Sequence, residues 1–195
     1  METRERIIEA AKQEFLSKGY EKSSLRAICK QAGVTTGALY FLFESKERLF
    51  CDIVEPFVAV GFQMSEKLRK REILHPETAE DNERQLMTTL YNSKDLIILV
   101  MEKAAGTRYA DFPQQMEHLL KGFFRQYFAE YTKHKIDDKL ITILVQGRIR
   151  VYMTILKESS SLQEALHLTE SMACYADAGT NAVIHKINEK DPIKP

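Results

Sequence analysis

The sequence predicts an all-α protein in which an N-terminal three-helix domain precedes a larger helical domain, with about nine helices in total. Apolar residues recur at helical spacing through most of the 195 residues. We find no alternating apolar segment that would indicate a β-strand. The segment from residue 24 to residue 46, SLRAICKQAGVTTGALYFLFESK, has the layout of a helix-turn-helix.

The first predicted helix begins at Thr3, which can cap it, and ends at Gly19. Its apolar residues fall on one face, as in a helix that packs on a core. These residues are Ile7, Ile8, Ala11 and Phe15. Lys18 suits the negative end of the helix dipole. Three helices within roughly fifty residues make a small core, so this domain should lean on the long helix that follows it.

Two short helices separated by a glycine come next. Leu25, Ile28 and Ala32 give the first of them an apolar face. Gly33 stands where a left-handed backbone is usually needed. Thr35 is placed to cap the second helix by accepting a hydrogen bond from a backbone amide. Because such a unit holds its second helix in the DNA major groove, we interpret the chain as a DNA-binding regulator.

A fourth helix begins with Ser45 as its expected cap and Lys46 in its first turn. A lysine in this position opposes the helix dipole, so helix stability explains it poorly. We therefore expect Lys46 to contact a DNA phosphate. The alternative is that Lys46 is an ordinary surface lysine.

The segment from Glu5 to Phe50 resembles the N-terminal domain of the TetR family of bacterial transcriptional repressors. The resemblance covers about a quarter of the chain and implies a DNA-binding domain at residues 1–48. It also implies a ligand-binding and dimerisation domain at residues 49–195. The matching residues are Ile8 to Phe15, Gly19, Ser24, Ile28, Ala32, Gly33, Val34, Thr35, Gly37, Leu39, Tyr40, Phe43, Ser45 and Lys46.

The resemblance also implies particular DNA contacts. The residues expected to hold phosphates are Ser24, Thr35, Tyr40 and Lys46. The residues expected to face base edges are Thr36, Gly37 and Ala38. A basic patch, expected from the sequence itself, consists of Arg4, Lys22, Arg26, Lys46 and Arg48.

The chain departs from the family pattern at Phe41 and Leu42, where family members often carry a polar aromatic residue and a histidine. Two phosphate contacts would then be absent. Phe41 can contact a thymine methyl group or pack against the domain, and packing is the expected outcome.

The overall charge is balanced, with 28 Lys and Arg against 28 Asp and Glu. Residues 1–50 hold nine basic and seven acidic side chains, a balance of only +2. Because strong nonspecific nucleic-acid binders are usually more basic, recognition should rest on the local patch and on two-fold symmetry. Binding should still weaken with salt, since each neutralised phosphate releases counterions.

The intervening helices are expected at residues 45–70, from Pro76 to 92, at 96–105 and at 112–133. Pro56 lies inside the first of them and should bend it, either as a hinge for signalling or as a passive bend. The tail from Asp191 to Pro195 is expected to fray.

The last two helices, expected at residues 137–158 and 161–187, are the predicted dimer surface. The first is apolar nearly all round, so it must be covered on several sides. The second carries small residues that let helices approach closely, namely Ala173, Ala176, Ala178, Gly179 and Ala182. A monomer core could give the same pattern. We favour a homodimer, since a two-fold axis would place two recognition helices roughly 34–36 Å apart on a palindromic operator.

The resemblance implies a small-molecule effector in a pocket between the fourth and eighth helices. Candidate lining residues combine aromatic bodies with a few polar ends. They are Tyr91, Met101, Phe123, Tyr127, Gln146, Arg150 and Tyr152. If buried, Gln146 and Arg150 could receive an anionic or carbonyl-bearing ligand, but we expect them to face solvent or a partner glutamate.

Enzyme motifs are absent from the sequence. The five histidines form no HExxH motif and no close Cys/His cluster, and no P-loop, GxSxG or GxGxxG is found. We expect no catalysis, no metal and no cofactor. Three widely spaced cysteines and the lack of a long apolar run indicate a cytoplasmic protein without a membrane span. Of these, Cys29 should be a small buried hydrophobe rather than an oxidation sensor.

Two functional hypotheses follow. In the first, a dimeric repressor leaves its operator when a small molecule binds. In the second, a DNA-binding regulator is switched by a protein partner, or activates transcription, without a small-molecule ligand. An enclosed, partly apolar cavity in the larger domain would favour the first hypothesis.

Overall fold

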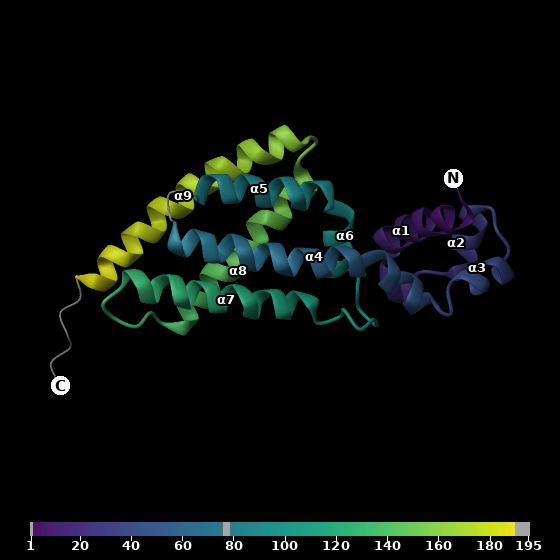
Figure 1. Ribbon diagram of the computed structural model, residues 1–195, viewed down its shortest axis with the longest axis horizontal. Coiled ribbons are helices and arrows are strands. Elements are labelled where there is room, and N and C mark those ends of the chain that lie inside the picture. Colours follow the sequence, from purple (N-terminus) through teal and green to yellow (C-terminus); the bar gives the residue numbers. More distant parts are fainter. Residues whose placement is uncertain (1, 76–78, 190–195) are drawn as a thin grey trace. The chain divides into compact units, whose positions relative to one another are not determined.

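The structure is a computed structural model that describes residues 2–75 and 79–189. Over these residues the regular secondary structure consists of nine α-helices (Figure 1). Their bounds are α1 Thr3–Lys22, α2 Leu25–Ala32, α3 Thr36–Leu42, α4 Lys46–Leu74, α5 Ala79–Asn92, α6 Lys94–Glu102, α7 Phe112–Tyr131, α8 Asp138–Glu158 and α9 Leu162–Asn188.

The all-α fold class and the order of the helices are confirmed. The caps of the last two helices follow the sequence: Asp137 accepts from the Lys139 amide at 2.8 Å, and Ser161 accepts from the Glu164 amide at 3.2 Å. The expected break at Pro76 and the expected fraying of the C-terminal tail lie outside the described residues.

Both ends of α1 differ from the prediction. Thr3 is the first helical residue rather than the cap, and the preceding Glu2 amide donates to the Glu5 carboxylate at 3.0 Å. Gly19 does interrupt the helix, with φ 75° and ψ 163°, but a short turn continues to Lys22. Only glycine adopts this backbone conformation without strain.

The chain divides into two compact units. The first contains the residues up to Met64 together with Ser93–Gln114, and the second contains Ser65–Asn92 together with the chain from Gln115. The first unit thus extends beyond residue 48. It does so because α6 packs on α1, and the amide of Tyr20 donates to the carbonyl of Lys103 at 2.9 Å.

The core of the first unit joins the three N-terminal helices to the first turns of α4. Phe15, Phe50 and Tyr20 form an aromatic cluster, with ring centroids 5.3 Å apart for Phe15 and Phe50 and 5.5 Å apart for Tyr20 and Phe50. Leu49 is fully buried beside Phe50. The small three-helix domain therefore does lean on the long helix, as its size requires.

Arg108 connects the segment after α6 to the first half of α4, within the first unit. Its amide donates to Glu47 at 3.2 Å, and its guanidinium contacts Glu55 at 2.7 Å. Hydrogen bonds with Tyr109 and then Glu55 raise the pKa of Arg108. The helix continues through Pro56, so the proline does not end α4.

The second unit has its own core among α7, α8 and α9. Phe128, Ile136, Ile141 and Val145 are buried together, and Phe124 packs against them. In the same unit, α5 packs along α9. The aromatic residues of α7 thus include core residues, as a helical apolar stripe usually does.

Candidate nucleic-acid interface

The turn between α2 and α3 depends on Gly33. This residue has φ 64° and ψ 41°, the left-handed conformation that its position predicted. The amide of Val34 then donates to the carbonyl of Cys29 at 3.0 Å, which closes the end of α2. α2 and α3 contact each other, and Ile28 and Ala32 on α2 and Leu39 on α3 are buried.

Thr35 caps α3 as predicted. Its hydroxyl accepts from the Ala38 amide at 3.1 Å. A hydroxyl that accepts in this way still has its own proton to donate, so the cap leaves Thr35 able to bind a phosphate oxygen. The cap and fully buried Leu39 together fix which side of α3 faces outward.

The outward side of α3 contains the residues predicted to meet DNA. Thr36 and Gly37 are exposed, Ala38 is half-buried, and Tyr40 is 53% exposed. Phe41 is 89% exposed, so the expectation that it packs into the domain is wrong. The helical period explains this result. Residues two apart on a helix point to nearly opposite sides, so Phe41 faces outward because Leu39 faces inward.

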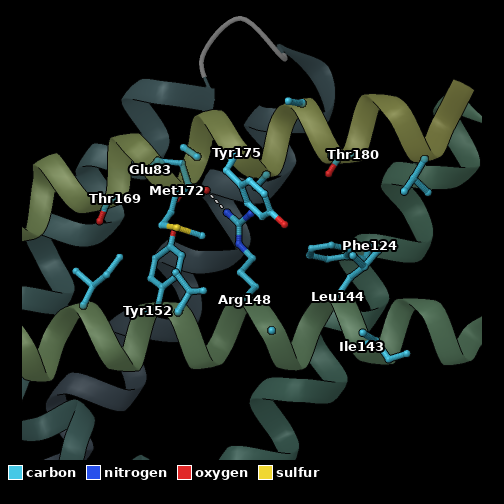
Figure 2. A pocket seen from close by; sticks show the side chains of 18 residues that line it. Glu83, Phe124, Ile143, Leu144, Arg148, Tyr152, Thr169, Met172, Tyr175 and Thr180 are labelled. Atoms are coloured by element: carbon cyan, nitrogen blue, oxygen red, sulfur yellow. Dashed lines mark hydrogen bonds and ion pairs between the residues drawn. The ribbon is translucent and has the colours of Figure 1, made fainter.

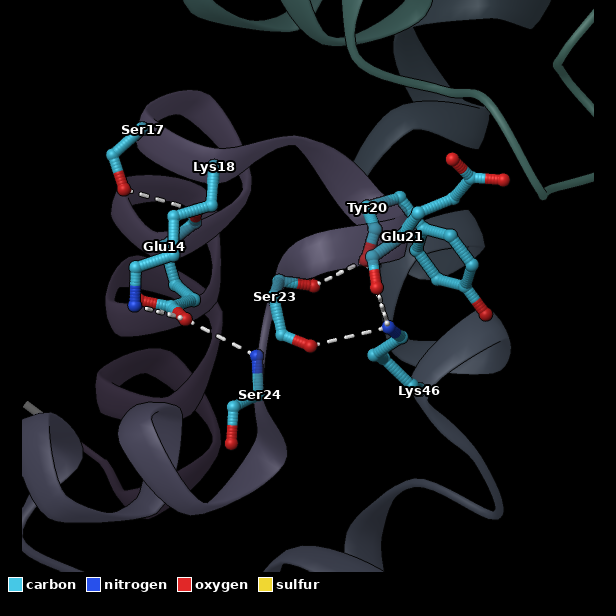
Figure 3. Close-up of polar contacts among 8 residues, drawn as sticks. All are labelled: Glu14, Ser17, Lys18, Tyr20, Glu21, Ser23, Ser24 and Lys46. Atoms are coloured by element: carbon cyan, nitrogen blue, oxygen red, sulfur yellow. Dashed lines mark hydrogen bonds and ion pairs between the residues drawn. The ribbon is translucent and has the colours of Figure 1, made fainter.

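Lys46 has a structural role that the sequence did not suggest (Figure 3). Its Nζ donates to the carbonyls of Tyr20 at 2.7 Å and Ser23 at 3.2 Å, and lies 4.3 Å from the centre of the Tyr20 ring. The lysine thereby caps the carbonyls at the C-terminal end of α1, where a positive charge is favourable. Lys46 therefore does stabilise a helix, namely the end of α1 rather than the start of its own helix α4. The phosphate contact remains a prediction.

Ser24, at the cap position of α2, is exposed, and its side chain makes no capping hydrogen bond. Its amide instead donates to the buried carboxylate of Glu14 at 3.1 Å, and Lys18 contacts the same oxygen at 2.9 Å (Figure 3). Glu14 thus satisfies the amide of the cap residue itself, the bond that a glutamate at the third helical position makes in a capping box, and exposed Ser24 keeps its hydroxyl free of a capping bond. The sequence signal for Glu14 was only its spacing of four residues from Lys18.

The predicted basic patch is partly neutralised within the protein. Arg4 and Arg48 both pair with Asp52, at 3.4 Å and 2.9 Å. Lys22 and Arg26 are exposed. Asp52 follows Arg48 by four residues, the spacing at which oppositely charged side chains pair on a helix.

The three cysteines differ in accessibility. Cys29 and Cys51 are buried in the first unit, whereas Cys174 on α9 is exposed. Burial raises the pKa of the Cys51 thiol. Cys29 thus has the placement of a small buried hydrophobe, as expected.

The candidate ligand residues are spread over both units. Met101 is half-buried on α6 in the first unit, and the others lie on α5, α7 and α8 of the second. Phe123 and Tyr127 are neighbours on α7, with ring centroids 6.1 Å apart. The half-buried side chain of Tyr91 lies on α5.

Gln146 and Arg150 are both exposed, as expected for a pair that faces solvent. Gln146 donates to the carboxylate of Glu117 at 3.3 Å. Hydrogen bonds from Lys121 and then from Gln146 lower the pKa of Glu117. The burial that an anion-receiving pair would need is therefore absent.

A cavity of about 460 Å³ lies in the second unit, along α8 and α9 (Figure 2). It is mostly apolar and open on one side. Of the ligand candidates, Tyr152 lines it. Glu83 and Arg148 form an ion pair in its wall. The small residues predicted to let helices approach are prominent in its lining, namely Ala173, Ala176, Ala178 and Gly179.

Among the described residues, no group of three or more His, Cys, Asp or Glu side chains is arranged to hold a metal ion. Within the same ranges, each helix is too short or too polar to cross a bilayer.

Residues 7–53 match the family model described as "Bacterial regulatory proteins, tetR family". The chain is 51% identical over 53 residues to the HTH-type transcriptional repressor BepR of Brucella suis biovar 1 (strain 1330). That match covers 27% of this chain and 25% of BepR. The first curated relatives are matched over about a quarter to a half of their own length.

Solved structures extend the likeness to the whole fold. A TetR-like transcriptional regulator from Rhodococcus sp. RHA1 is 21% identical, with a TM-score of 0.58 over 91% of this chain and 96% of that one. A gamma-butyrolactone receptor (ArpA-like protein) is 24% identical, with a TM-score of 0.58 and the same coverage of both chains. These relatives are similar in fold, and their names describe regulators and a receptor rather than enzymes.

Proposed function

We propose that the chain is a repressor of the TetR family whose homodimer binds a palindromic operator, since residues 7–53 match the family model and the fold is that of TetR-like regulators. A small molecule bound in the domain at residues 49–195 releases the operator. The observation that carries this proposal is the outward face of α3, where Thr36, Gly37, Tyr40 and Phe41 are exposed beside buried Leu39. A helix presented in this way fits the major groove.

The phosphate contacts of this proposal surround α3. Exposed Ser24 and Arg26 begin α2, and the Thr35 hydroxyl can donate while it caps α3. Tyr40 is half exposed on α3. Lys46 would reach a phosphate only by sharing or giving up its carbonyl partners.

A second copy of the chain is the proposed cover for α8 and α9. The open cavity there is apolar, and Ile143 and Tyr175 beside it are 65% and 73% exposed. Exposed apolar surface of this kind commonly marks an interface. Small residues at positions 147, 176 and 179 would let the partner helices approach closely.

Replacing Tyr175 with Glu is expected to convert the dimer to a monomer and to abolish operator binding, because a charge would be buried at the interface without a partner. Sedimentation equilibrium of the full chain measures this. Asn181→Glu is the matched control, since Asn181 is exposed on the same helix and does not line the cavity. A Tyr175→Glu protein that stays dimeric would place the interface elsewhere.

The small-molecule step is supported by likeness of fold, since one structure of this fold is named a gamma-butyrolactone receptor. Of the candidate ligand residues, Tyr152 lines the cavity along α8 and α9 and is the one we propose to contact the effector there. If the small molecule bound the DNA-free conformation about 1–3 kcal/mol more tightly than the DNA-binding conformation, operator affinity would fall about 5–150-fold.

The second hypothesis is a regulator switched by a protein partner, or an activator. The cavity along α8 and α9 is only partly enclosed, so it does not decide between the small-molecule mechanism and this one. In vitro transcription from a template that carries the selected operator separates repression from activation. A second experiment adds a metabolite extract, freed of macromolecules, to the purified protein bound to that operator. Release of the protein would indicate a small-molecule switch rather than a protein partner.

Asp52→Asn is expected to strengthen binding to duplex DNA, because it frees Arg4 and Arg48 from their shared carboxylate. If each arginine then gains one phosphate, the slope of log K against log salt steepens by about 0.9 per contact. A fluorescence anisotropy titration at several salt concentrations measures this slope. Asp95→Asn, which removes an exposed carboxylate on α6, is the control. Equal slopes in all three proteins would show that the arginines do not reach DNA.

A further inference from the structure

Among the described residues, Phe41 is the large apolar residue with the highest exposed fraction, 89%. It lies on α3, the helix that the proposed function places in the major groove. Its neighbour Leu39 is fully buried, so the domain already has its apolar anchor at this point. Folding of the domain therefore gives no reason for a phenyl ring at position 41.

The turn of α3 before Phe41 carries little side chain. Side chains on a helix lean toward its N-terminus, so the ring lies over the preceding turn. Gly37 occupies that turn, four residues earlier, and presents no side chain. A Cβ built on Gly37 would touch the Thr35 hydroxyl at an ordinary contact distance of 3.8 Å and no other neighbouring group, so this turn is uncrowded. Thr36 and Tyr40 precede Gly37 and Phe41 in the chain and carry hydroxyl groups.

A phenyl ring limits which part of DNA it can recognise. It has no hydrogen-bond donor or acceptor and no charge, so it cannot bind a phosphate as Tyr, His or Lys would. In the major groove, the four base pairs present donors and acceptors, and thymine alone adds an apolar group, its C5-methyl.

We propose that Phe41 is a specificity-determining residue that reads thymine in each operator half-site through contact with the C5-methyl group. This inference rests on the proposed DNA-binding function and deepens it by naming one base. The contact is apolar, so it selects sequence without adding to the salt dependence of binding.

The test removes single methyl groups from DNA. An operator is first obtained by selection with the wild-type protein. Each thymine of the half-site is then replaced, one position at a time, by deoxyuridine, which lacks the methyl group and keeps every hydrogen-bonding group. At one position, wild-type affinity should fall about fourfold for one half-site and about fifteenfold when both half-sites are changed.

Phe41→Ala should bind the thymine and the deoxyuridine operators equally, with an unchanged salt slope, because the two changes remove the same contact. Phe41→Leu is the matched variant: its apolar side chain should retain part of the thymine preference. Both variants should melt at the wild-type temperature, since Phe41 is almost fully exposed.

Two results would overturn the inference while leaving the proposed function intact. One is a wild-type protein that tolerates deoxyuridine at every position. The other is a Phe41→Ala protein that keeps the full preference for thymine. If Phe41→Ala bound the operator like the wild type, the exposed ring would belong to a protein contact instead. If the wild-type protein selected no sequence at all, the proposed function would fail and this inference with it.

Discussion

Leu39→Ala is expected to abolish specific DNA binding by loosening α3 from the domain. Leu39 is fully buried between the helices of the helix-turn-helix, and its truncation leaves a cavity. Such changes cost about 2–5 kcal/mol, a large part of the stability of a small unit. The melting temperature should fall by about 10 °C or more. Thermal unfolding followed by circular dichroism, with anisotropy on a labelled operator, measures both effects.

Phe41→Ala is the control for this prediction, because it truncates an apolar residue on the same helix that is 89% exposed. It should leave the melting temperature unchanged. A Leu39→Ala protein with wild-type stability would contradict the inward placement of Leu39, and with it the assignment of the outward face of α3.

Lys46→Met is expected to destabilise the first unit by about 2 kcal/mol, the usual value of hydrogen bonds to a charged group. The methionine keeps the length of the side chain but cannot donate to the carbonyls of Tyr20 and Ser23. These carbonyls would lose their cap at the end of α1. The melting temperature of the full chain should fall by about 4–8 °C, and operator affinity should fall with it.

Salt dependence separates the two roles of Lys46. If Lys46 also neutralises a phosphate, the salt slope of the folded variant should be smaller by about 0.9 for each half-site. An unchanged slope would assign Lys46 to the cap alone. Lys22→Met is the control, since Lys22 is an exposed lysine of the predicted basic patch. An unchanged melting temperature for Lys46→Met would refute the capping role.

Local chemistry made most of the helix-turn-helix predictable. The glycine at position 33 and the threonine at position 35 act through neighbouring backbone groups, so their roles can be read from sequence order alone. The helical period likewise placed Ile28 and Leu39 inside the domain. The same period applied to Phe41 would have placed it outside, but its apolar character argued for burial.

Contacts between distant segments could not be read in this way. Lys46 caps carbonyls more than twenty residues earlier in the chain, and Arg108 reaches Glu47 and Glu55 from the segment after α6. Each partner looks like an ordinary charged surface residue in the sequence. The ligand residues were equally hard to predict, because an aromatic side chain on a helix such as α7 can pack in the core or line a pocket, and its sequence pattern is the same in both cases.

The decisive experiment is selection of random duplex DNA by the purified protein, followed by sequencing. We expect a palindrome whose half-sites lie about one helical turn apart and share a thymine that depends on Phe41. Recovery of no common sequence, even at low salt, would contradict the claim that this chain is a dimeric, sequence-specific DNA-binding regulator.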